Sequence, residues 1–304
     1  MRVAVIDIGT NTVLMLIAEI SGQPPVILRD EHSIARLGEG VDKTHQISET
    51  AYARFAEIMR RYKALIDEYH VDRVIAFATS AMRDAENREE IIQRTKDEFG
   101  IEIELLSGND EARWSFQGAL FGIPPAEIKG IVATIDIGGG STEISVGENG
   151  RYLQGFSINI GAVRIKERFL SSPIDAEQIA REYIDAELQI IKSIYLFPKK
   201  LIAVAGTPTS LAAIKHRLDH FDTSAVDGTV INSNELEIMI RLMFSISAQE
   251  LVRRYPAVSP ARADILPAGA LILDEVLEVM KIDEVHVSTK GVRYGILLRE
   301  MAQM

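Results

Sequence analysis

Two segments of the chain carry the same local pattern. Residues 2–20 read RVAVIDIGTNTVLMLIAEI, and residues 130–148 read GIVATIDIGGGSTEISVGE. In each segment an apolar β-rich run ends in an aspartate, a glycine turn with hydroxyl residues follows, and a second β-rich run completes a predicted tight hairpin. The two aspartates, Asp7 and Asp136, lie about one domain length apart, so the repeat predicts a duplicated domain rather than an array of short units.

Strands alternate with helices between and after the two hairpins. Helices are predicted over residues 48–69, 87–99, 110–121, 175–195, 207–217 and 264–280, with two more that start at Asn232 and near Gly291, and strands over 73–78, 101–105, 201–205 and 284–287. This alternation predicts an α/β fold with both faces of each sheet covered. The 304 residues suffice for two domains, predicted over 1–125 and 126–304, and we expect the last helix, about 291–304, to pack back on the first domain.

Three helix ends carry specific sequence signals. Asp175 with Gln178, and Asn232 with Glu235, have the spacing of a capping box at a helix start. Gly100 follows the helix predicted over 87–99, at the position where glycine commonly ends a helix. These signals predict two helix starts and one helix end.

The composition narrows the function classes. Lysine and arginine number 33 against 44 aspartate and glutamate residues, a net charge of −11, which disfavours non-specific binding to nucleic acid or an anionic membrane but permits a local basic groove. The absence of cysteine excludes disulfides and a cysteine nucleophile and is typical of a reducing compartment. No apolar run is long enough to span a bilayer. We therefore expect a cytoplasmic protein that binds neither nucleic acid nor membrane.

The second hairpin carries the strongest chemical signal, the octet DIGGGSTE at residues 136–143. Consecutive glycines let a backbone approach a phosphate closely and present N–H donors to it. Carboxylates beside such a turn would repel an anion unless a hard cation lies between them, so the octet predicts Mg²⁺, with Mn²⁺ as an alternative. A plain hairpin turn, which is the other interpretation, needs fewer glycines. The predicted phosphate-binding residues of this turn are Gly138, Gly139, Gly140, Ser141 and Thr142, and the predicted metal ligands are Asp136 and Glu143.

The first hairpin has the same pattern of an aspartate, a glycine turn and hydroxyl residues, but with one glycine instead of three. On its own its turn is a weak signal, but its register with the second hairpin strengthens the interpretation that each domain contributes one phosphate-binding turn to a shared cleft. Asp7, the counterpart of Asp136, is predicted as a further metal ligand. The residues predicted to bind phosphate here are Asp7, Gly9, Thr10, Asn11 and Thr12.

A third glycine turn lies between the strand and the helix predicted over 201–205 and 207–217. A helix N-terminus offers unpaired N–H groups and a positive dipole end, so Gly206 and Thr207 are predicted to bind a phosphate or a nucleoside. The alternative is a simple strand-to-helix turn in which Thr207 is the N-cap and Pro208 the first helical residue.

Taken together, these motifs resemble a known family. The hairpins and the third turn resemble the phosphate and nucleoside motifs of the acetate kinase, sugar kinase, heat-shock ATPase and actin superfamily. Over its whole length the chain resembles the exopolyphosphatase and guanosine pentaphosphate phosphohydrolase family, through the octet and through RLGEGV at 36–41, ATSAMR at 78–83, SGNDEAR at 107–113, GAVR at 161–164 and GVRYG at 291–295. The resemblance implies two actin-like (ribonuclease H-like) α/β domains with the active site in the cleft between them.

The same resemblance implies residue roles. Glu111 matches the general base of the family, and Asp136 and Glu143 match residues implicated in metal binding and water positioning. Arg83 matches an arginine expected to contact phosphate. For Arg36, Arg113 and Arg164 the resemblance leaves open which of them contact substrate.

The expected activity is Mg²⁺-dependent hydrolysis of the terminal phosphate of inorganic polyphosphate, which releases orthophosphate. Guanosine pentaphosphate, as part of a stringent response, is the alternative substrate, because both molecules present a terminal phosphoanhydride. A kinase of the same superfamily and a non-catalytic sensor are further alternatives, which the context of Glu111 disfavours. The chain resembles the short form of the family, for which we expect lower processivity on long chains than in the long forms. A homodimer is a further alternative for its assembly.

Overall fold

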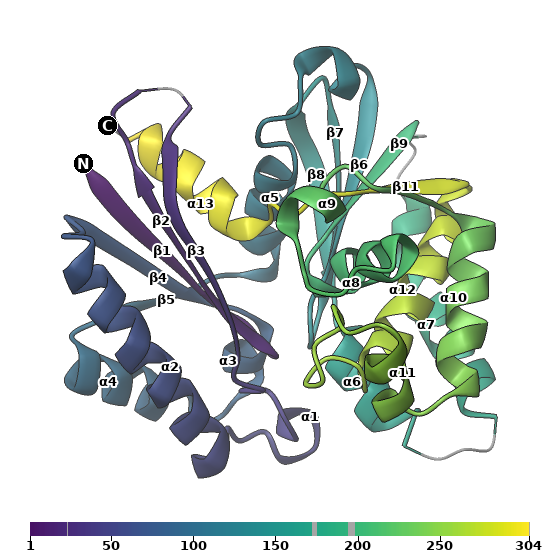
Figure 1. Cartoon of the computed structure of the whole chain (residues 1–304), viewed down its shortest axis with the longest axis horizontal. Coiled ribbons are helices and arrows are strands. Elements are labelled where there is room, and N and C mark those ends of the chain that lie inside the picture. Colours follow the sequence, from purple (N-terminus) through teal and green to yellow (C-terminus); the bar gives the residue numbers. More distant parts are fainter. Residues whose placement is uncertain (23, 172–174, 194–197, 304) are drawn as a thin grey trace.

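The computed structural model of the chain describes residues 1–22, 24–171, 175–193 and 198–303. Within these ranges the strands form two sheets, which lie side by side in Figure 1. The first has the order β3-β2-β1-β4-β5, with β1 (Arg2–Ile8), β2 (Thr12–Glu19), β3 (Val26–Ile34), β4 (Arg73–Ala78) and β5 (Ile103–Leu105). The second has the order β10-β11-β9-β6-β7-β8, with β6 (Ile131–Ile137), β7 (Thr142–Glu148), β8 (Arg151–Ile158), β9 (Lys200–Val204), β10 (Val230–Asn232) and β11 (Glu284–Val287).

Both predicted hairpins form. Ile8 lies opposite Val13 across the first turn, and Ile137 lies opposite Thr142 across the second. The first strand of each hairpin also pairs in parallel with a later strand, β1 with β4 and β6 with β9. The duplication predicted from the sequence is therefore a duplication of sheet topology.

The helices divide between the two sheets. We call the first sheet with α1 (Val41–Thr44), α2 (Glu49–Glu68), α3 (Ser80–Asp84) and α4 (Arg88–Phe99) the first lobe. We call the second sheet with α6 (Ala162–Arg168), α7 (Ala176–Leu188), α8 (Gly206–His216), α9 (Thr223–Val226), α10 (Ser233–Ser245), α11 (Ala248–Arg254) and α12 (Leu266–Met280) the second lobe. Two short 3₁₀ helices, Pro125–Ile128 and Gln189–Ser193, complete the described elements. No helix within the described ranges has the length and apolar character needed to cross a membrane.

Each sheet is covered on both faces, as a buried α/β sheet requires. In the first lobe, Ile6 and Phe55 belong to the core between the sheet and α2, while Val5 and Leu297 belong to the core on the opposite face. In the second lobe, Ile135 and Leu271 share one core, and Phe116 packs with Val132 and Val204 in another.

The two remaining helices, α5 (Gly108–Ala119) and α13 (Val292–Met301), connect the lobes. α13 contacts β1 and β2 of the first lobe, and Figure 1 shows this yellow helix beside the purple strands. α5 contacts β6, β7 and β8 of the second lobe. The two helices pack so closely that a Cβ atom at Gly118 would lie only 1.9 Å from the Gly291 carbonyl oxygen. The chain therefore crosses between the lobes twice, and the domain limit at residue 125 stays a prediction.

The α/β prediction is confirmed, and the strands and helices that the sequence pattern missed have separate causes. β3 and β8 extend the two hairpins, but β3 reads VILRDEHSI and β8 reads RYLQGFSI, without a regular apolar alternation. Both lie at the outer edge of a sheet, where fewer side chains are buried. The short helices α1, α3, α6, α9 and α11 are at most seven residues long, too short for a clear helical period.

The predicted helix ends are partly right. The capping box of Asn232 and Glu235 forms, and Gly100 ends α4 with a φ of 68°. The capping box at Asp175 is wrong, because Asp175 has a φ of 52° and its side chain makes no capping hydrogen bond. The Gln178 side chain instead donates to Glu182. The predicted end of this helix, near residue 195, lies outside the described residues.

The strand-to-helix turn at residue 206 also differs from the simple capped turn. α8 begins at Gly206, so Ala205 is its N-cap, Thr207 its second residue and Pro208 its third. Ala205 has a φ of 75°, a conformation that costs a non-glycine residue free energy and is found where surrounding structure enforces it.

Candidate active site

A cavity of about 370 Å³ lies between the lobes. Its walls come from the turns of both hairpins, the N-terminal end of α8 and the start of α13. The predicted site residues that line it are Asp7, Gly9, Thr10, Asn11, Thr12, Glu111, Asp136, Gly138, Gly139, Gly140, Ser141, Gly206 and Thr207. The fold thus brings all three predicted turns to one cleft.

The first turn presents one buried polar atom that has no hydrogen-bond partner among the described residues. The Gly9 N–H donates to the Thr12 carbonyl at 3.0 Å, which closes the turn. The Asn11 side chain is buried, and its Oδ1 atom has no hydrogen-bond partner among the described residues. Because an unpaired buried polar atom costs free energy, Asn11 is suited to contact a ligand in the cavity.

The second turn is closed in the same way, by a 3.0 Å hydrogen bond from the Gly138 N–H to the Ser141 carbonyl. Asp136 and Glu143 lie opposite each other on β6 and β7. Asp136 Oδ2 accepts a hydrogen bond of 2.6 Å from Ser115, and Glu143 Oε1 accepts one of 2.6 Å from Ser157. The predicted phosphate ligand Thr142 is fully buried and donates to the Ile160 carbonyl, so its hydroxyl faces the core of the second lobe rather than the cavity.

Four carboxyl groups gather beside the cavity, and burial raises the pKa of each. Burial, and then the negative charge of Glu111, raise the pKa of Asp7 to about 8 against the attraction of Arg293. Burial also raises the pKa of Glu111 to about 7, although Arg83 opposes it. The pKa of Glu143 is raised by burial and by Glu111 and Asp136, and that of Asp136 by burial against the hydrogen bond from Ser115. This concentration of carboxyls favours protons or a cation at neutral pH.

The donor set fits a hard cation that is shared with a phosphate. Among the described residues, no three acidic or histidine side chains are arranged as a complete metal cage. Mg²⁺ seldom needs one, since it is usually held by one or two carboxylates together with water and substrate phosphate oxygens. Asp7 and Asp136 line the cavity at the two turns, where such a cation would lie.

The glycines of the second turn also have a packing role. A Cβ atom at Gly139 would lie 2.8 Å from Thr10 Cβ, and one at Gly140 would lie 2.5 Å from Ser80 Oγ. Thr10 and Ser80 belong to the first lobe, so the two lobes meet through the backbone of this turn. The absence of a side chain at Gly139 and Gly140 therefore allows the two lobes to approach closely. The sequence pattern does not indicate this second role.

Comparison with known proteins identifies the family. Residues 16–304 match the model of the Ppx/GppA phosphatase family. The chain belongs to this family. Exopolyphosphatase 2 of Mycobacterium tuberculosis is 31% identical over 317 residues, which cover 98% of this chain and 98% of that protein. A bifunctional 3-dehydroquinate synthase/phosphatase of Fusobacterium nucleatum is 31% identical over 97% of this chain, which spans 46% of that longer protein.

Solved structures of Ppx/GppA proteins share the fold. An exopolyphosphatase from Cytophaga hutchinsonii superposes with a TM-score of 0.92 at 28% identity and covers 100% of this chain and 99% of its own. The Ppx/GppA family member of Aquifex aeolicus superposes with a TM-score of 0.83 at 30% identity, over 100% of this chain and 98% of its own. The predicted architecture of two actin-like α/β domains is therefore confirmed, and the chain is an enzyme of a phosphatase family.

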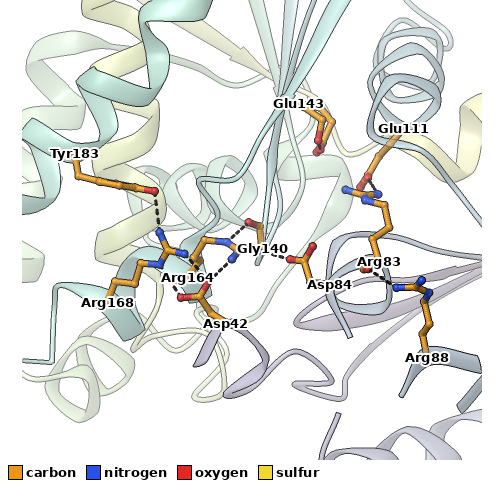
Figure 2. Close-up of polar contacts among 11 residues, drawn as sticks. Asp42, Arg83, Asp84, Arg88, Glu111, Gly140, Glu143, Arg164, Arg168 and Tyr183 are labelled. Atoms are coloured by element: carbon orange, nitrogen blue, oxygen red, sulfur yellow. Dashed lines mark hydrogen bonds and ion pairs between the residues drawn. The ribbon is translucent and has the colours of Figure 1, made fainter. Parts of the chain in front are cut away.

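In this Ppx/GppA phosphatase, Arg83 contacts the predicted base rather than the cavity. Arg83 Nη1 donates to Glu111 Oε2 at 2.5 Å and to the Leu106 carbonyl at 3.0 Å (Figure 2). Glu111 lies in the first turn of α5, which Ser107 caps by accepting the Asp110 N–H. The ion pair holds the Glu111 carboxylate at the cavity wall.

The three arginines that the sequence left open do not line the cavity. Arg36 donates to Asp264 at 2.8 Å and to the Ala261 carbonyl at 3.0 Å, which links the lobes. The Arg113 guanidinium lies 5.3 Å from the centre of the Trp114 ring. Arg164 binds the Gly140 carbonyl and two aspartates of the first lobe.

Arg262 lines the cavity although no sequence motif indicates it. Its Nη2 donates to Thr12 Oγ1 at 3.3 Å, and its guanidinium lies against Gly206, where a Cβ atom would overlap it. Burial alone lowers its pKa to about 10, so within the described residues no carboxylate compensates its charge. Its sequence neighbourhood, SPARAD, carries no signal for this position.

Three more polar groups at the cavity come from distant segments. Ser80 lines the cavity with a buried Oγ that has no partner among the described residues. Asp30 and Arg293 also line it and form an ion pair between β3 and α13. Burial opposes the ionisation of Asp30, but His32 and Arg293 hold its pKa at about 2. Only the tertiary fold brings these residues together.

Proposed function

We propose that this chain is an exopolyphosphatase, which hydrolyses the terminal phosphoanhydride of inorganic polyphosphate and releases orthophosphate. The observation that carries the proposal is the position of Glu111, whose carboxylate lines a cavity walled by two glycine turns and is held there by Arg83. The full-length similarity to exopolyphosphatase 2 of Mycobacterium tuberculosis supports it further.

The chemistry follows from the arrangement of this chain's own groups. Phosphoryl transfer passes through a loose transition state, so catalysis depends on positioning and charge stabilisation. Both glycine turns line the cavity, so we expect their backbone N–H groups, other than those of Gly9 and Gly138 that close the turns, to contact the terminal phosphate, with Asn11 and Ser80 as further polar contacts. Glu111 in its ionised form accepts a proton from the attacking water, and Arg83 keeps the carboxylate in place. A well-placed general base contributes roughly 10²–10⁴-fold to the rate.

We further propose Mg²⁺ as the cofactor, held by Asp7 and Asp136 together with phosphate oxygens. When bound, such a cation would neutralise the charge of the phosphates beside the carboxylates. Glu143 lies opposite Asp136 on the neighbouring strand and accepts a hydrogen bond from Ser157. We assign Glu143 to the orientation of water around the cation.

Guanosine pentaphosphate is a second candidate substrate, favoured by the extent of the cavity. The cavity continues beyond the two turns to the N-terminal end of α8, Phe221 and Arg262. A volume of about 370 Å³ falls in the range of pockets that bind small molecules. A substrate with a nucleoside would occupy space there that a terminal phosphate alone leaves empty.

Orthophosphate release by the purified protein tests these proposals. Polyphosphate and guanosine pentaphosphate are supplied in parallel with Mg²⁺, with Mn²⁺, or with a chelator. We expect release with Mg²⁺, loss of release with the chelator, and a decrease of about 10²–10⁴-fold in Glu111→Gln. The faster substrate identifies the preferred one.

Glu90→Gln is the matched control, because Glu90 lies in the first turn of α4 as Glu111 does in α5 but is exposed. It should retain wild-type activity. Release from neither substrate by the wild type, despite binding, would contradict the hydrolase proposal and favour a sensor or a kinase whose acceptor is missing.

A further inference from the structure

Arg164 joins the second glycine turn to the opposite lobe. Its side chain is about nine-tenths buried, at 10% exposed, and its guanidinium has three separate partners (Figure 2). Nε donates to the Gly140 carbonyl at 2.8 Å, Nη1 donates to Asp42 and Nη2 donates to Asp84. Arg164 and Gly140 belong to the second lobe, whereas Asp42 in α1 and Asp84 in α3 belong to the first.

The neighbouring part of α6 also rests on the first lobe. Arg168, one helical turn after Arg164, donates to both carboxylate oxygens of Asp42 at 2.6 and 2.7 Å. Glu167 accepts a hydrogen bond of 3.1 Å from the Gly40 N–H. The Arg168 side chain is 36% exposed, and Gly140 is not among its hydrogen-bond partners within the described residues. Arg168 therefore shares the ion pair between lobes with Arg164 but not the contact with the turn.

The contact with Gly140 has a consequence for the cavity. The C=O of Gly140 and the N–H of Ser141 belong to one planar trans peptide unit, so they point in opposite directions. Ser141 lines the cavity. Glycine backbones have wide conformational freedom, so a fixed Gly140 carbonyl also fixes the direction in which the Ser141 N–H is presented.

We propose that Arg164 is a positioning residue that couples closure of the two lobes to the shape of the phosphate-binding turn. With the lobes closed, Asp42 and Asp84 hold the guanidinium, and its Nε in turn holds the Gly140 carbonyl. When the lobes separate, Asp42 and Asp84 move away from Arg164. The guanidinium then becomes mobile, and it no longer holds the Gly140 carbonyl in one position. The kinetic part of this inference rests on the proposed hydrolase function, whereas the coupling between lobes does not.

The matched pair Arg164→Lys and Arg168→Lys tests the role of the turn. Lysine keeps the charge, but its compact ammonium cannot replace a planar guanidinium that reaches three acceptors on different sides. We expect Arg164→Lys to lower kcat for orthophosphate release on the order of 10²-fold, as a misplaced catalytic group does, with a smaller change in KM. Arg168→Lys retains an ion pair with Asp42 and should keep the wild-type kcat. Equal loss of kcat in both variants would reduce Arg164 to an ordinary contact between lobes and overturn the proposal.

Asp84→Asn provides a second test that leaves Arg164 in place, so the proposal stays testable if Arg164→Lys does not fold. Asp84 contacts Arg164 but is not among the residues that line the cavity between the lobes. We expect Asp84→Asn to lower kcat in the same direction, and the double variant to be no slower than Arg164→Lys alone, because both changes remove one linkage. If the decrease in kcat of the double variant equals the product of the two single decreases, the two residues act independently and the coupling is contradicted.

A distance measurement separates the coupling from the activity. The chain has no cysteine, so Glu57→Cys on α2 and Ile238→Cys on α10 place two spin labels on exposed positions of opposite lobes. We expect a longer and broader distance distribution in Arg164→Lys and Asp84→Asn than in the labelled parent or Arg168→Lys. An unchanged distribution in all variants would overturn the coupling even if the protein is an exopolyphosphatase. A wild type without orthophosphate release would overturn the hydrolase proposal, while the label distances would still report on the coupling.

Discussion

Arg83 and Glu111 form an ion pair of 2.5 Å at the wall of the cavity between the lobes. Burial raises the pKa of Glu111 to about 7, and the positive charge of Arg83 limits that rise. The pair therefore holds the pKa of the proposed base close to neutral pH, where a general base is most effective.

The first prediction concerns Arg83→Met. Loss of the guanidinium removes the attraction that lowers the pKa of Glu111, so the pKa rises. Glu111 must be ionised to accept a proton, so the acidic limb of the pH profile of kcat/KM should move to higher pH. At a fixed pH on that limb, the rate falls about tenfold for each pH unit by which the limb moves. Arg94→Met, which removes an exposed pair with Glu49, should leave the limb in place. An acidic limb that stays in place in Arg83→Met would show that Glu111 is not the titrating base.

The second prediction concerns the stability of the metal-free protein and Asp7. Its pKa is raised from 3.8 to about 8, first by burial and then by Glu111. Below pH 3.8 both the folded and unfolded forms are protonated. Between pH 3.8 and about 8 the unfolded form is ionised while the folded carboxyl resists ionisation, so the free energy of unfolding falls as the pH rises. Asp7→Asn removes this loss and should stabilise the metal-free protein at pH 8 by roughly 5 kcal/mol, with little effect near pH 4.

Chemical denaturation in the presence of a chelator, at pH 4, 6 and 8, measures this effect. Asp219→Asn is the control, since Asp219 is an exposed aspartate of the second lobe. Asp7→Asn should also lose orthophosphate release, because Asp7 is one of the two proposed ligands of Mg²⁺. Equal stability of wild type and Asp7→Asn at pH 8 would mean that Asp7 is ionised freely in the folded state.

The sequence anticipated the hairpins and their carboxylates because their signals are local. Asp7, Asp136 and Glu143 lie within a few residues of a glycine turn, and the turn itself determines where they point. Glu111 was found through the family resemblance, and the structure places it buried in the first turn of α5; its role as the base stays a prediction. The cleft between the lobes followed from the duplication, since the two matching turns of the two sheets line one cavity.

The rest of the site depends on long-range packing, which a single sequence does not encode in any local pattern. Asp30 and Arg293 are 263 residues apart, and Arg262 reaches Thr12 from 250 residues away. Arg83 was expected to bind phosphate, yet it pairs with Glu111 28 residues further on. Thr142 belongs to the octet, but strand pairing turns its hydroxyl towards the Ile160 carbonyl.

The third prediction concerns Gly139→Ala. A Cβ atom there would lie 2.8 Å from Thr10 Cβ and 3.2 Å from Val163 Cγ2, so the variant must push the lobes apart or shift the turn. Overpacking of this kind costs about 1–3 kcal/mol, and kcat/KM should fall with it. Gly22→Ala is the control, because its Cβ would meet nothing within 4 Å. Thermal unfolding and orthophosphate release measure both effects, and wild-type behaviour of Gly139→Ala would argue that the lobes are apart in solution.

The fourth prediction uses Arg262 to separate the two candidate substrates. Arg262 is a cavity-lining cation without a compensating carboxylate in the described part of the chain, and it lies against Gly206 rather than at Glu111. A hydrogen bond to a charged group is worth about 1.5–3 kcal/mol, so Arg262→Met should raise KM roughly 10- to 100-fold for a substrate that reaches this end of the cavity. We expect the larger increase for guanosine pentaphosphate, and little change in kcat for either substrate. Arg217→Met, at an exposed arginine that ends α8, should match the wild type. Equal increases for both substrates would place Arg262 on a phosphate that they share, and unchanged KM values would limit it to packing against Gly206.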